Sequence, residues 1–309
     1  MSFILVTPCT GYKVRGRDPI PTAIELPEGP QHTVERAWRD ALKKSQPTYI
    51  PAALYQGISY KFILPFARRH KVPLYTISAG LGLLSPDSII PEYDLTVGAG
   101  PSRIQSRVIG EFCYASWWKS NNKGQPYPIA HLVKRFPQTR FLFALPQSYL
   151  DLVRADLEQI PRRAFSRLRF FATKLPESGG IFDLYMPYTK AMDLPGSPVP
   201  GGGVSGPQRR LIHYVEHIMQ TGSSVADDKQ AIREVMAGIK NIERRRVSDK
   251  ELAQIMQEER KLYPDMGRTA FLAHINQTKA IAGDHTRMRR IYKQTFVEDD
   301  RRALGFFSK

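Results

Sequence analysis

Three carboxylates gather in one short stretch of the chain. Asp87, Glu92 and Asp94 follow the glycines Gly80 and Gly82, where a backbone can turn sharply or approach a ligand closely. A strand that ends in glycines and then acids is where an open α/β sheet places its chemistry. The stretch is also compatible with a strand, a tight turn and a solvated loop, so the acids alone do not identify an active site.

Two apolar runs near the N-terminus position these residues. The run 74–78 ends at Ser78 and is typical of a buried strand, as is the run 3–6. The run 3–6 leads to Cys9, Thr10 and Lys13, where backbone N–H groups and a positive charge can bind an anion. The glycine spacing fits neither a P-loop nor a dinucleotide fingerprint, so the sequence predicts an anion site without identifying a nucleotide-binding motif.

Aromatic and amide side chains precede a helix that is expected to run through residue 70. Tyr55 and Gln56 offer a ring face and an amide suited to holding a base or a sugar. They fit equally well as packing residues at the start of a helix. Trp38 lies on the apolar stripe of a helix predicted over 33–45 and is expected to pack in the core.

The order of the remaining elements predicts the fold class. A buried strand at 140–146, a helix at 149–158 and a strand at 168–172 alternate along the chain. This alternation predicts an α/β fold with a mainly parallel sheet flanked by helices. We expect this catalytic domain to span residues 1–222.

Residues 223–309 are predicted to form an all-helical domain. Three short helices end in a basic one that carries Arg287, Arg289, Arg290 and Lys293, which resembles a helix-turn-helix module that binds DNA. A small helical cap or a dimerisation domain explains the same pattern, because basic helices are common.

The charge of the chain favours a polyanionic partner. The 309 residues include 45 Lys and Arg against 29 Asp and Glu, a formal net charge of +16. Residues 102–174 hold thirteen basic and four acidic residues. Nucleic acid is the first expectation and an anionic membrane the second, and a basic protein without such a partner remains an alternative.

Other classes are disfavoured by composition. No apolar run reaches the ~18 residues of a membrane span, and the N-terminus lacks the basic region of a signal peptide. Two cysteines argue against a disulfide framework or a cysteine-rich metal site, which favours a cytoplasmic protein.

Two later motifs allow more than one interpretation. The glycine- and proline-rich stretch 195–207 leads into Arg209 and Arg210 at a helix start, which would suit a phosphate, although a linker is equally compatible. His213, Glu216 and His217 match the H-x-x-E-H pattern of inverted zincins. A third ligand is not recognisable, so we predict neither a metal nor a cofactor.

Several motifs together resemble the YaaA-like group and its relatives encoded near DNA-modification and phage-defence genes. They are 9–13 (CTGYK), 51–55 (PAALY), 77–84 (ISAGLGLL) and 90–94 (IPEYD), and they cover about the first hundred residues. The group often has an aromatic residue where Leu81 stands. The resemblance implies a DNA-associated α/β domain, and some relatives look like anti-phage DNA glycosylases that remove modified bases.

The leading hypothesis is therefore an antiviral DNA N-glycosylase that acts on a modified base flipped out of double-stranded DNA. Breaking the N-glycosidic bond develops positive charge on the sugar, and a carboxylate must face that charge or activate a water. The predicted catalytic residues are Asp94, Glu92 and Asp87, in that order. The predicted base- and sugar-binding residues are Tyr55, Gln56, Tyr93, Ser78, Gly80, Gly82, Cys9 and Thr10. The predicted DNA-backbone contacts are Lys13, Arg209, Arg210, Arg287, Arg289, Arg290 and Lys293.

A non-catalytic DNA-binding protein and a base-exchanging transglycosylase are the alternatives to the glycosylase hypothesis.

Overall fold

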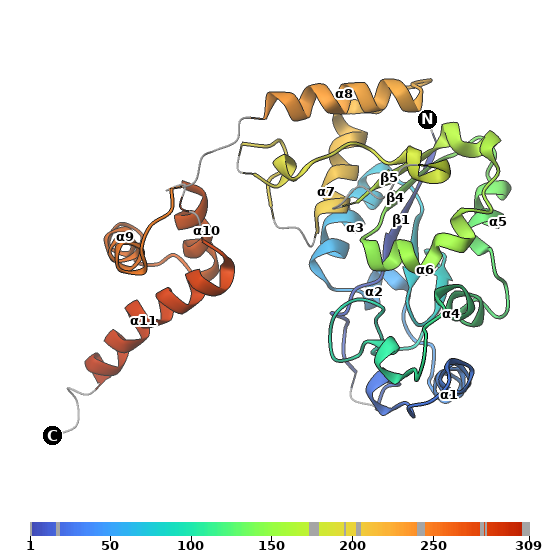
Figure 1. Ribbon diagram of the computed structural model, residues 1–309, viewed down its shortest axis with the longest axis horizontal. Coiled ribbons are helices and arrows are strands. Elements are labelled where there is room, and N and C mark those ends of the chain that lie inside the picture. Colours follow the sequence, from blue (N-terminus) through green and yellow to red (C-terminus); the bar gives the residue numbers. More distant parts are fainter. Residues whose placement is uncertain are drawn as a thin grey trace. The chain divides into compact units, whose positions relative to one another are not determined.

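The chain divides into two compact units, 1–239 and 240–309 (Figure 1). The computed structural model describes residues 2–16, 19–172, 179–194, 196–201, 205–239, 245–278, 281 and 283–304. The division follows helix α8 (Val225–Gly238) and therefore lies later in the chain than the boundary predicted after residue 222. No described helix has both the length and the apolar character needed to cross a membrane.

The first unit is built on a five-stranded, mostly parallel sheet with the strand order β3-β2-β1-β4-β5. The strands are β1 (Phe3–Pro8), β2 (Leu74–Ser78), β3 (Gly82–Leu84), β4 (Arg140–Ala144) and β5 (Leu168–Phe171). β1 pairs in parallel with both β2 and β4, and β4 pairs in parallel with β5. Only β3 runs antiparallel to its neighbour, β2. The predicted α/β class with a mainly parallel sheet is confirmed.

The central strands are apolar because both faces of the sheet are covered. Every residue of β1, β4 and β5 is buried. The register places Leu5 of β1 between Leu74 of β2 and Leu142 of β4. Such continuous apolar runs, without the alternation of a half-exposed strand, are typical of parallel strands.

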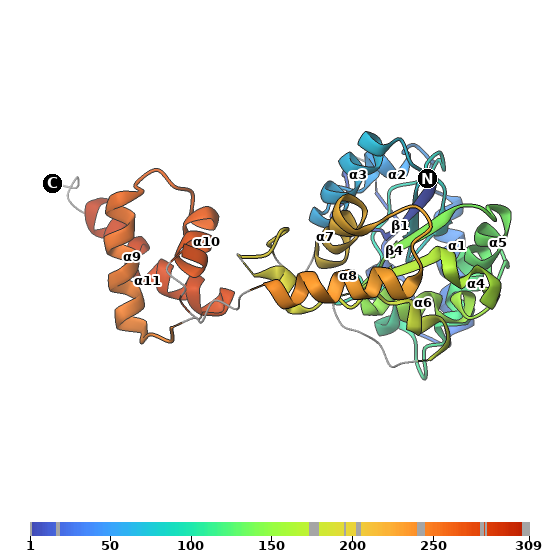
Figure 2. The ribbon, with the colours of Figure 1, turned by 90° about the horizontal axis from the view of Figure 1, so that it is seen from above.

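Helices cover the sheet on both sides. The α-helices of the first unit other than α8 are α1 (Gln31–Lys43), α2 (Pro51–Leu54), α3 (Ile58–His70), α4 (Tyr114–Asn121), α5 (Pro128–Arg135), α6 (Gln147–Leu157) and α7 (Gly206–His213). α3 and α7 pack against each other on one side of the sheet, while α4, α5 and α6 pack together on the other (Figures 1 and 2). Trp38 of α1 is buried in the core, as predicted, and its indole N–H donates to the carbonyl oxygen of Gly80 at 2.7 Å.

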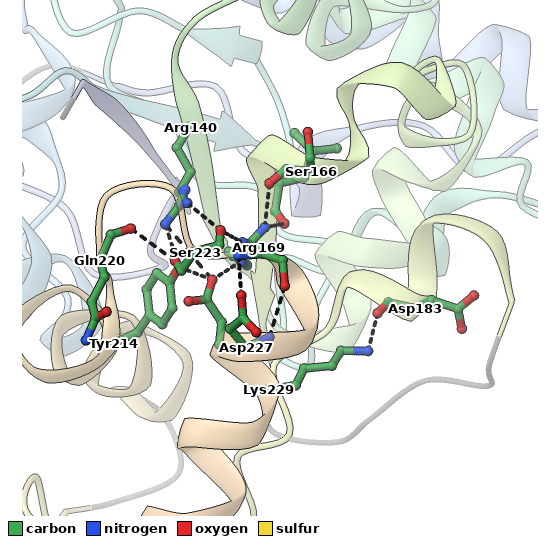
Figure 3. A network of polar contacts seen from close by, with 12 residues as sticks. Arg140, Ser166, Arg169, Asp183, Tyr214, Gln220, Ser223, Asp227 and Lys229 are labelled. Carbon is green, nitrogen blue, oxygen red and sulfur yellow. Dashed lines mark hydrogen bonds and ion pairs between the residues drawn. The ribbon is translucent and has the colours of Figure 1, made fainter.

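A buried polar network fixes α8 to the amino-terminal ends of β4 and β5 (Figure 3). Arg169 of β5 donates through Nε to Asp228 Oδ2 at 2.6 Å, and the Tyr214 hydroxyl donates to the same oxygen at 2.6 Å. Arg140 of β4 donates to the Tyr214 hydroxyl at 3.0 Å and to the carbonyl oxygen of Ser223 at 3.1 Å. The two buried guanidinium groups therefore share one carboxylate.

The second unit contains helices α9 (Asp249–Leu262), α10 (Arg268–Thr278) and α11 (His285–Leu304). Ser248 caps α9, because its side chain accepts a hydrogen bond from the N–H of Glu251 at 3.2 Å. Buried apolar side chains hold this unit together: Val247, Leu252, Met256, Phe271, Leu272, Ile275, Ile281, Met288 and Ile291. It thus has a small core of its own.

Candidate functional site

A cavity of about 480 Å³ lies at the carboxyl-terminal ends of β1 and β4. The chain leaves β1 toward β2 on one side, whereas β4 lies on the other side, so the direction of strand addition reverses here. Open α/β sheets bind ligands in the crevice at such a switch point. The lining residues are Pro8, Cys9, Thr10, Gly11, Tyr12, Gly57, Ile58, Ser59, Thr96, Gly98, Pro146, Ser148, Tyr149, Pro207 and Gln208. We call this space the switch-point cavity.

Three helices begin at the switch-point cavity. Residues in the first turn of α3, α6 and α7 belong to its lining, and no side chain caps any of these three helices. The first N–H groups of a helix have no intrahelical acceptor and carry partial positive charge. The cavity therefore offers backbone donors to an anionic or carbonyl-bearing ligand.

Gln208 is the most enclosed polar side chain of this lining, with a relative exposure of 1%. Its Nε2 donates to Thr7 Oγ1 at 3.0 Å and to the carbonyl oxygen of Ala144 at 3.2 Å, bridging β1 and β4. Its Oε1 is buried and has no hydrogen-bond partner among the described residues. The sequence did not predict Gln208, because its only signal is its place at a helix start beside two arginines.

Cys9 and Thr10, two predicted binding residues, do line the switch-point cavity. Cys9 Sγ lies 3.0 Å from the Tyr149 hydroxyl, and burial raises the pKa of Tyr149, so this phenol stays protonated. Thr10 Oγ1 accepts a hydrogen bond from the N–H of Gly57 at 3.1 Å. A Cβ atom at Gly57 would lie 2.5 Å from Thr10 Cβ, so glycine is required for this close approach.

A second cavity of about 630 Å³, the basic cavity, lies beside the first. It is lined by Gly11, Tyr12, Lys13, Val14, Arg15, Gln56 and Lys61. Gly11 and Tyr12 border both cavities. The lining includes Gln56, a predicted base- or sugar-binding residue, and three basic residues.

Lys13 is buried, with a relative exposure of 8%. Its Nζ lies 4.3 Å from the centroid of the Tyr93 ring and has no hydrogen-bond partner in the described part of the chain. Burial lowers the pKa of Lys13, while Cys9, Asp94 and Glu92 act in the opposite direction. The amine is enclosed, and the contact of Lys13 with the DNA backbone stays a prediction.

Two of the three predicted acids line a third cavity of about 360 Å³, the acidic cavity, together with Arg15. Glu92 and Asp94 are two residues apart in an extended segment, so their side chains project to the same side. Glu92 Oε2 accepts from the N–H of Gly16 at 2.6 Å, and Asp94 Oδ2 accepts from Ser102 Oγ at 2.6 Å. Asp87 is exposed on the turn after β3 and is not among the residues that line this cavity.

Tyr55, Tyr93 and Ser78 form a buried cluster behind these cavities. The Tyr93 hydroxyl lies 3.0 Å from the Tyr55 hydroxyl and 2.6 Å from Ser78 Oγ. All three side chains are buried, and burial raises the pKa of both tyrosines. The aromatic rings pack in the core, and their role in holding a base stays a prediction.

Packing also explains the glycines Gly80 and Gly82. A Cβ atom at Gly80 would lie 2.8 Å from Trp38 Cζ2. Gly82 has a φ angle of +78°, and a Cβ atom there would lie 2.3 Å from Asn122 Oδ1. The N–H groups of Gly80 and Leu81 donate to Ser78 Oγ. The predicted ligand donors of this turn are thus used within the fold.

Arg209 and Arg210 are buried at the start of α7, with relative exposures of 3% and 1%. Arg209 Nη2 lies 2.6 Å from Asp193 Oδ1, and Arg210 Nη2 lies 3.2 Å from Asp193 Oδ2. Arg210 also donates to the carbonyl oxygen of Ala172 at 2.8 Å. These guanidinium groups are enclosed and bind a carboxylate of their own chain, and their contact with phosphate stays a prediction.

The basic residues of α11 fall into two classes. Arg287 and Arg290 form ion pairs with Asp249, at 2.7 Å and 2.6 Å. Arg289 and Lys293 are exposed on the same helix. The four predicted DNA contacts therefore differ in how freely their charge is presented.

The H-x-x-E-H motif is not arranged as a zinc site. His213 is buried, and its Nδ1 lies 2.8 Å from the Tyr188 hydroxyl, while burial lowers its pKa to about 4. Glu216 forms an ion pair with Arg69 of α3. Within the described ranges, no group of three or more His, Cys, Asp or Glu side chains could hold a metal ion.

Comparisons with protein-family models, with curated proteins and with solved structures found no match to this chain.

Proposed function

We propose that the chain is a DNA N-glycosylase that removes a modified base and leaves an abasic site. One observation carries the proposal: the carboxylates of Glu92 and Asp94 line one cavity, beside a strand-end loop that also borders a ligand-sized cavity. A carboxylate next to a pocket for a flipped base is what cleavage of an N-glycosidic bond requires. The sequence resemblance to anti-phage glycosylases supports the same reaction and an antiviral role.

The base would occupy the switch-point cavity. Its volume of about 480 Å³ is within the range of small-molecule sites, ~300–1,000 Å³. Gln208 Oε1 supplies a buried acceptor, and Cys9 and Tyr149 supply polar groups on the opposite strand and helix. Proline and isoleucine side chains of the lining would contact the face of a base.

The sugar and its phosphates would lie over the neighbouring cavities. Arg15 and Lys61 of the basic cavity are exposed and suited to bind phosphate. Asp94, followed by Glu92, would face the positive charge that develops on the sugar or activate a water. Arg289 and Lys293 of a helix-turn-helix-like second unit would add backbone contacts to double-stranded DNA.

The test uses duplexes that carry 5-hydroxymethylcytosine, its glucosylated form or 7-deazaguanine at one position. We expect an alkali-labile break at the modified position of at least one duplex, and release of the free base detected by mass spectrometry. Asp94→Asn and Glu92→Gln should each lower the rate ~10²–10⁴-fold, the usual contribution of a catalytic acid or base.

Asp87→Asn is the matched control, because Asp87 is an exposed carboxylate away from the acidic cavity. It should keep the wild-type rate. Full activity in both the Asp94 and Glu92 variants would overturn the site assignment. DNA that is bound but chemically unchanged would instead indicate a non-catalytic binding protein, and incorporation of a labelled free base would indicate a base-exchanging transglycosylase.

A further inference from the structure

Lys13 is a buried side chain whose amine has no hydrogen-bond partner among the described residues. Its Nζ lies over the face of the Tyr93 ring, 4.3 Å from the ring centroid. The nearest carboxylates are engaged elsewhere, Glu92 by the N–H of Gly16 and Asp94 by Ser102 Oγ. Buried lysines are normally paired, so an unpaired one points to a role other than packing.

The position of Lys13 along the loop after β1 is central to the site. Gly11 and Tyr12 border the switch-point cavity, Lys13 itself borders the basic cavity, and Arg15 borders both the basic and the acidic cavity. With a base in the first cavity and phosphate in the second, the sugar would lie over the loop between them. Lys13 follows Gly11 and Tyr12, which border both cavities, and itself lines the second.

The environment of Lys13 favours a nucleophilic amine. Burial lowers its pKa, so more of the amine is unprotonated near neutral pH than in an exposed lysine. Among the described residues the amine has no hydrogen bond to break, and a cation–π contact is a weak restraint by comparison. Rotation of its four-carbon stem can therefore bring the amine into the cavity that it borders.

We propose that Lys13 is a nucleophile that forms an imine with the aldehyde carbon C1′ of an abasic deoxyribose. The Nζ lone pair attacks C1′ of the ring-opened sugar. The carbonyl oxygen then leaves as water with the two protons of the amine, and a C=N bond replaces the C=O bond. Hydrolysis reverses the step. This inference rests on the proposed function, because removal of the base is what produces the aldehyde.

Borohydride trapping tests the imine directly. The full chain is incubated with an oligonucleotide duplex that already carries one abasic site, made from deoxyuridine by a separate uracil-DNA glycosylase, and sodium borohydride is added. We expect a protein–DNA adduct that survives denaturing electrophoresis, and peptide mass spectrometry should locate the reduced linkage on Lys13. Lys13→Met should lower the adduct yield at least ~100-fold.

Lys43→Met is the matched control, because Lys43 is an exposed lysine on α1, away from the cavities. It should give the wild-type yield. Lys13→Arg keeps the charge without a nucleophilic amine and should also lose the adduct, which separates chemistry from electrostatic binding. Absence of an adduct with wild-type protein, or a linkage mapped to another amine, would overturn the inference even where a variant fails to fold.

The two proposals can fail separately, because the abasic site is supplied ready-made. Trapping at Lys13 without any base release would remove the glycosylase proposal and leave the imine chemistry. Base release without trapping would have the opposite meaning: the chain is then a glycosylase whose product leaves without a covalent intermediate.

Discussion

The two ends of the central sheet differ in how their buried charged groups are paired. At the amino-terminal ends of β4 and β5, Arg140 and Arg169 share the carboxylate of Asp228 and donate to backbone oxygens (Figure 3). Lys13 Nζ in the loop after β1 and Gln208 Oε1 at the start of α7 are buried without a hydrogen-bond partner within the described residues. Paired charges hold the fold together, whereas a buried amine without a partner costs stability, which proteins tolerate where function requires it.

The largest expected effect comes from breaking the paired end. Asp228→Asn leaves the buried guanidinium group of Arg169 without its counter-charge. Loss of one partner of a buried pair costs about 3–5 kcal/mol. We expect the free energy of unfolding, measured by urea denaturation, to fall by that amount.

Asp227→Asn is the matched control for this change. Asp227 is the neighbouring residue, and its carboxylate accepts from the exposed N–H of Ser224 in the capping box of α8. Asn keeps an oxygen acceptor for this N–H, so the loss should stay below the ~0.5–2 kcal/mol that removal of a helix cap costs. Equal losses in the two variants would show that the network contributes no more than a surface cap.

Lys13→Met should have the opposite sign. The substitution removes a desolvated charge and keeps an apolar stem of similar length against the Tyr93 ring. We expect the free energy of unfolding to rise by about 1 kcal/mol, since the desolvation cost exceeds the cation–π attraction that is lost. A destabilised Lys13→Met variant would show that this lysine stabilises the fold, contrary to the contrast between the two ends of the sheet.

A smaller effect is expected in how the difference in unfolding free energy between the wild-type protein and Lys13→Met depends on pH. Tyr93, Cys9, Asp94, Glu92 and Arg15 lie near Lys13, and burial is the largest influence on its pKa, which lies below the ordinary lysine value of 10.5. Between the lowered pKa and 10.5 the unfolded chain binds more protons, so wild-type stability rises with pH relative to Lys13→Met. Urea denaturation between pH 7 and 10 should show the gap between the two proteins narrowing, and a constant gap would contradict the lowered pKa.

How much of this could be predicted from the sequence depended on the range of the interactions. The apolar runs of β1 and β4 and the acidic pair Glu92 and Asp94 are local patterns, and the structure brings each pair of elements or residues together. Gln208 was missed because its partner Thr7 lies 201 residues away along the chain. Burial of this kind is set by tertiary packing and leaves no local pattern.

The ion pairs of Arg209 and Arg210 were not predicted, for the same reason. Next to a glycine- and proline-rich stretch, these arginines have the local pattern of a phosphate site. The carboxylate that they bind, Asp193, lies at the end of a short 3₁₀ helix, and nothing in the sequence links it to them. The tyrosines Tyr55 and Tyr93 likewise meet only in the folded chain.

The smallest effect on stability is expected on α11, where paired and free charges occur on one helix. Arg289 and Lys293 are exposed, so Arg289→Ala and Lys293→Ala should each change the free energy of unfolding by less than about 0.5 kcal/mol. If these side chains contact phosphate, the slope of log Kobs for DNA against log salt should become shallower by about 0.9 for each contact removed.

Arg290→Ala tests a paired charge on the same helix, because Arg290 already forms an ion pair with Asp249. A side chain that must exchange a carboxylate for a phosphate gains less from DNA than one that exchanges only water. Its removal should therefore change the salt slope less than removal of Arg289 does. Slopes equal to the wild-type slope in all three variants would mean that α11 makes no phosphate contact, and DNA binding would then be sought at the basic cavity of the first unit.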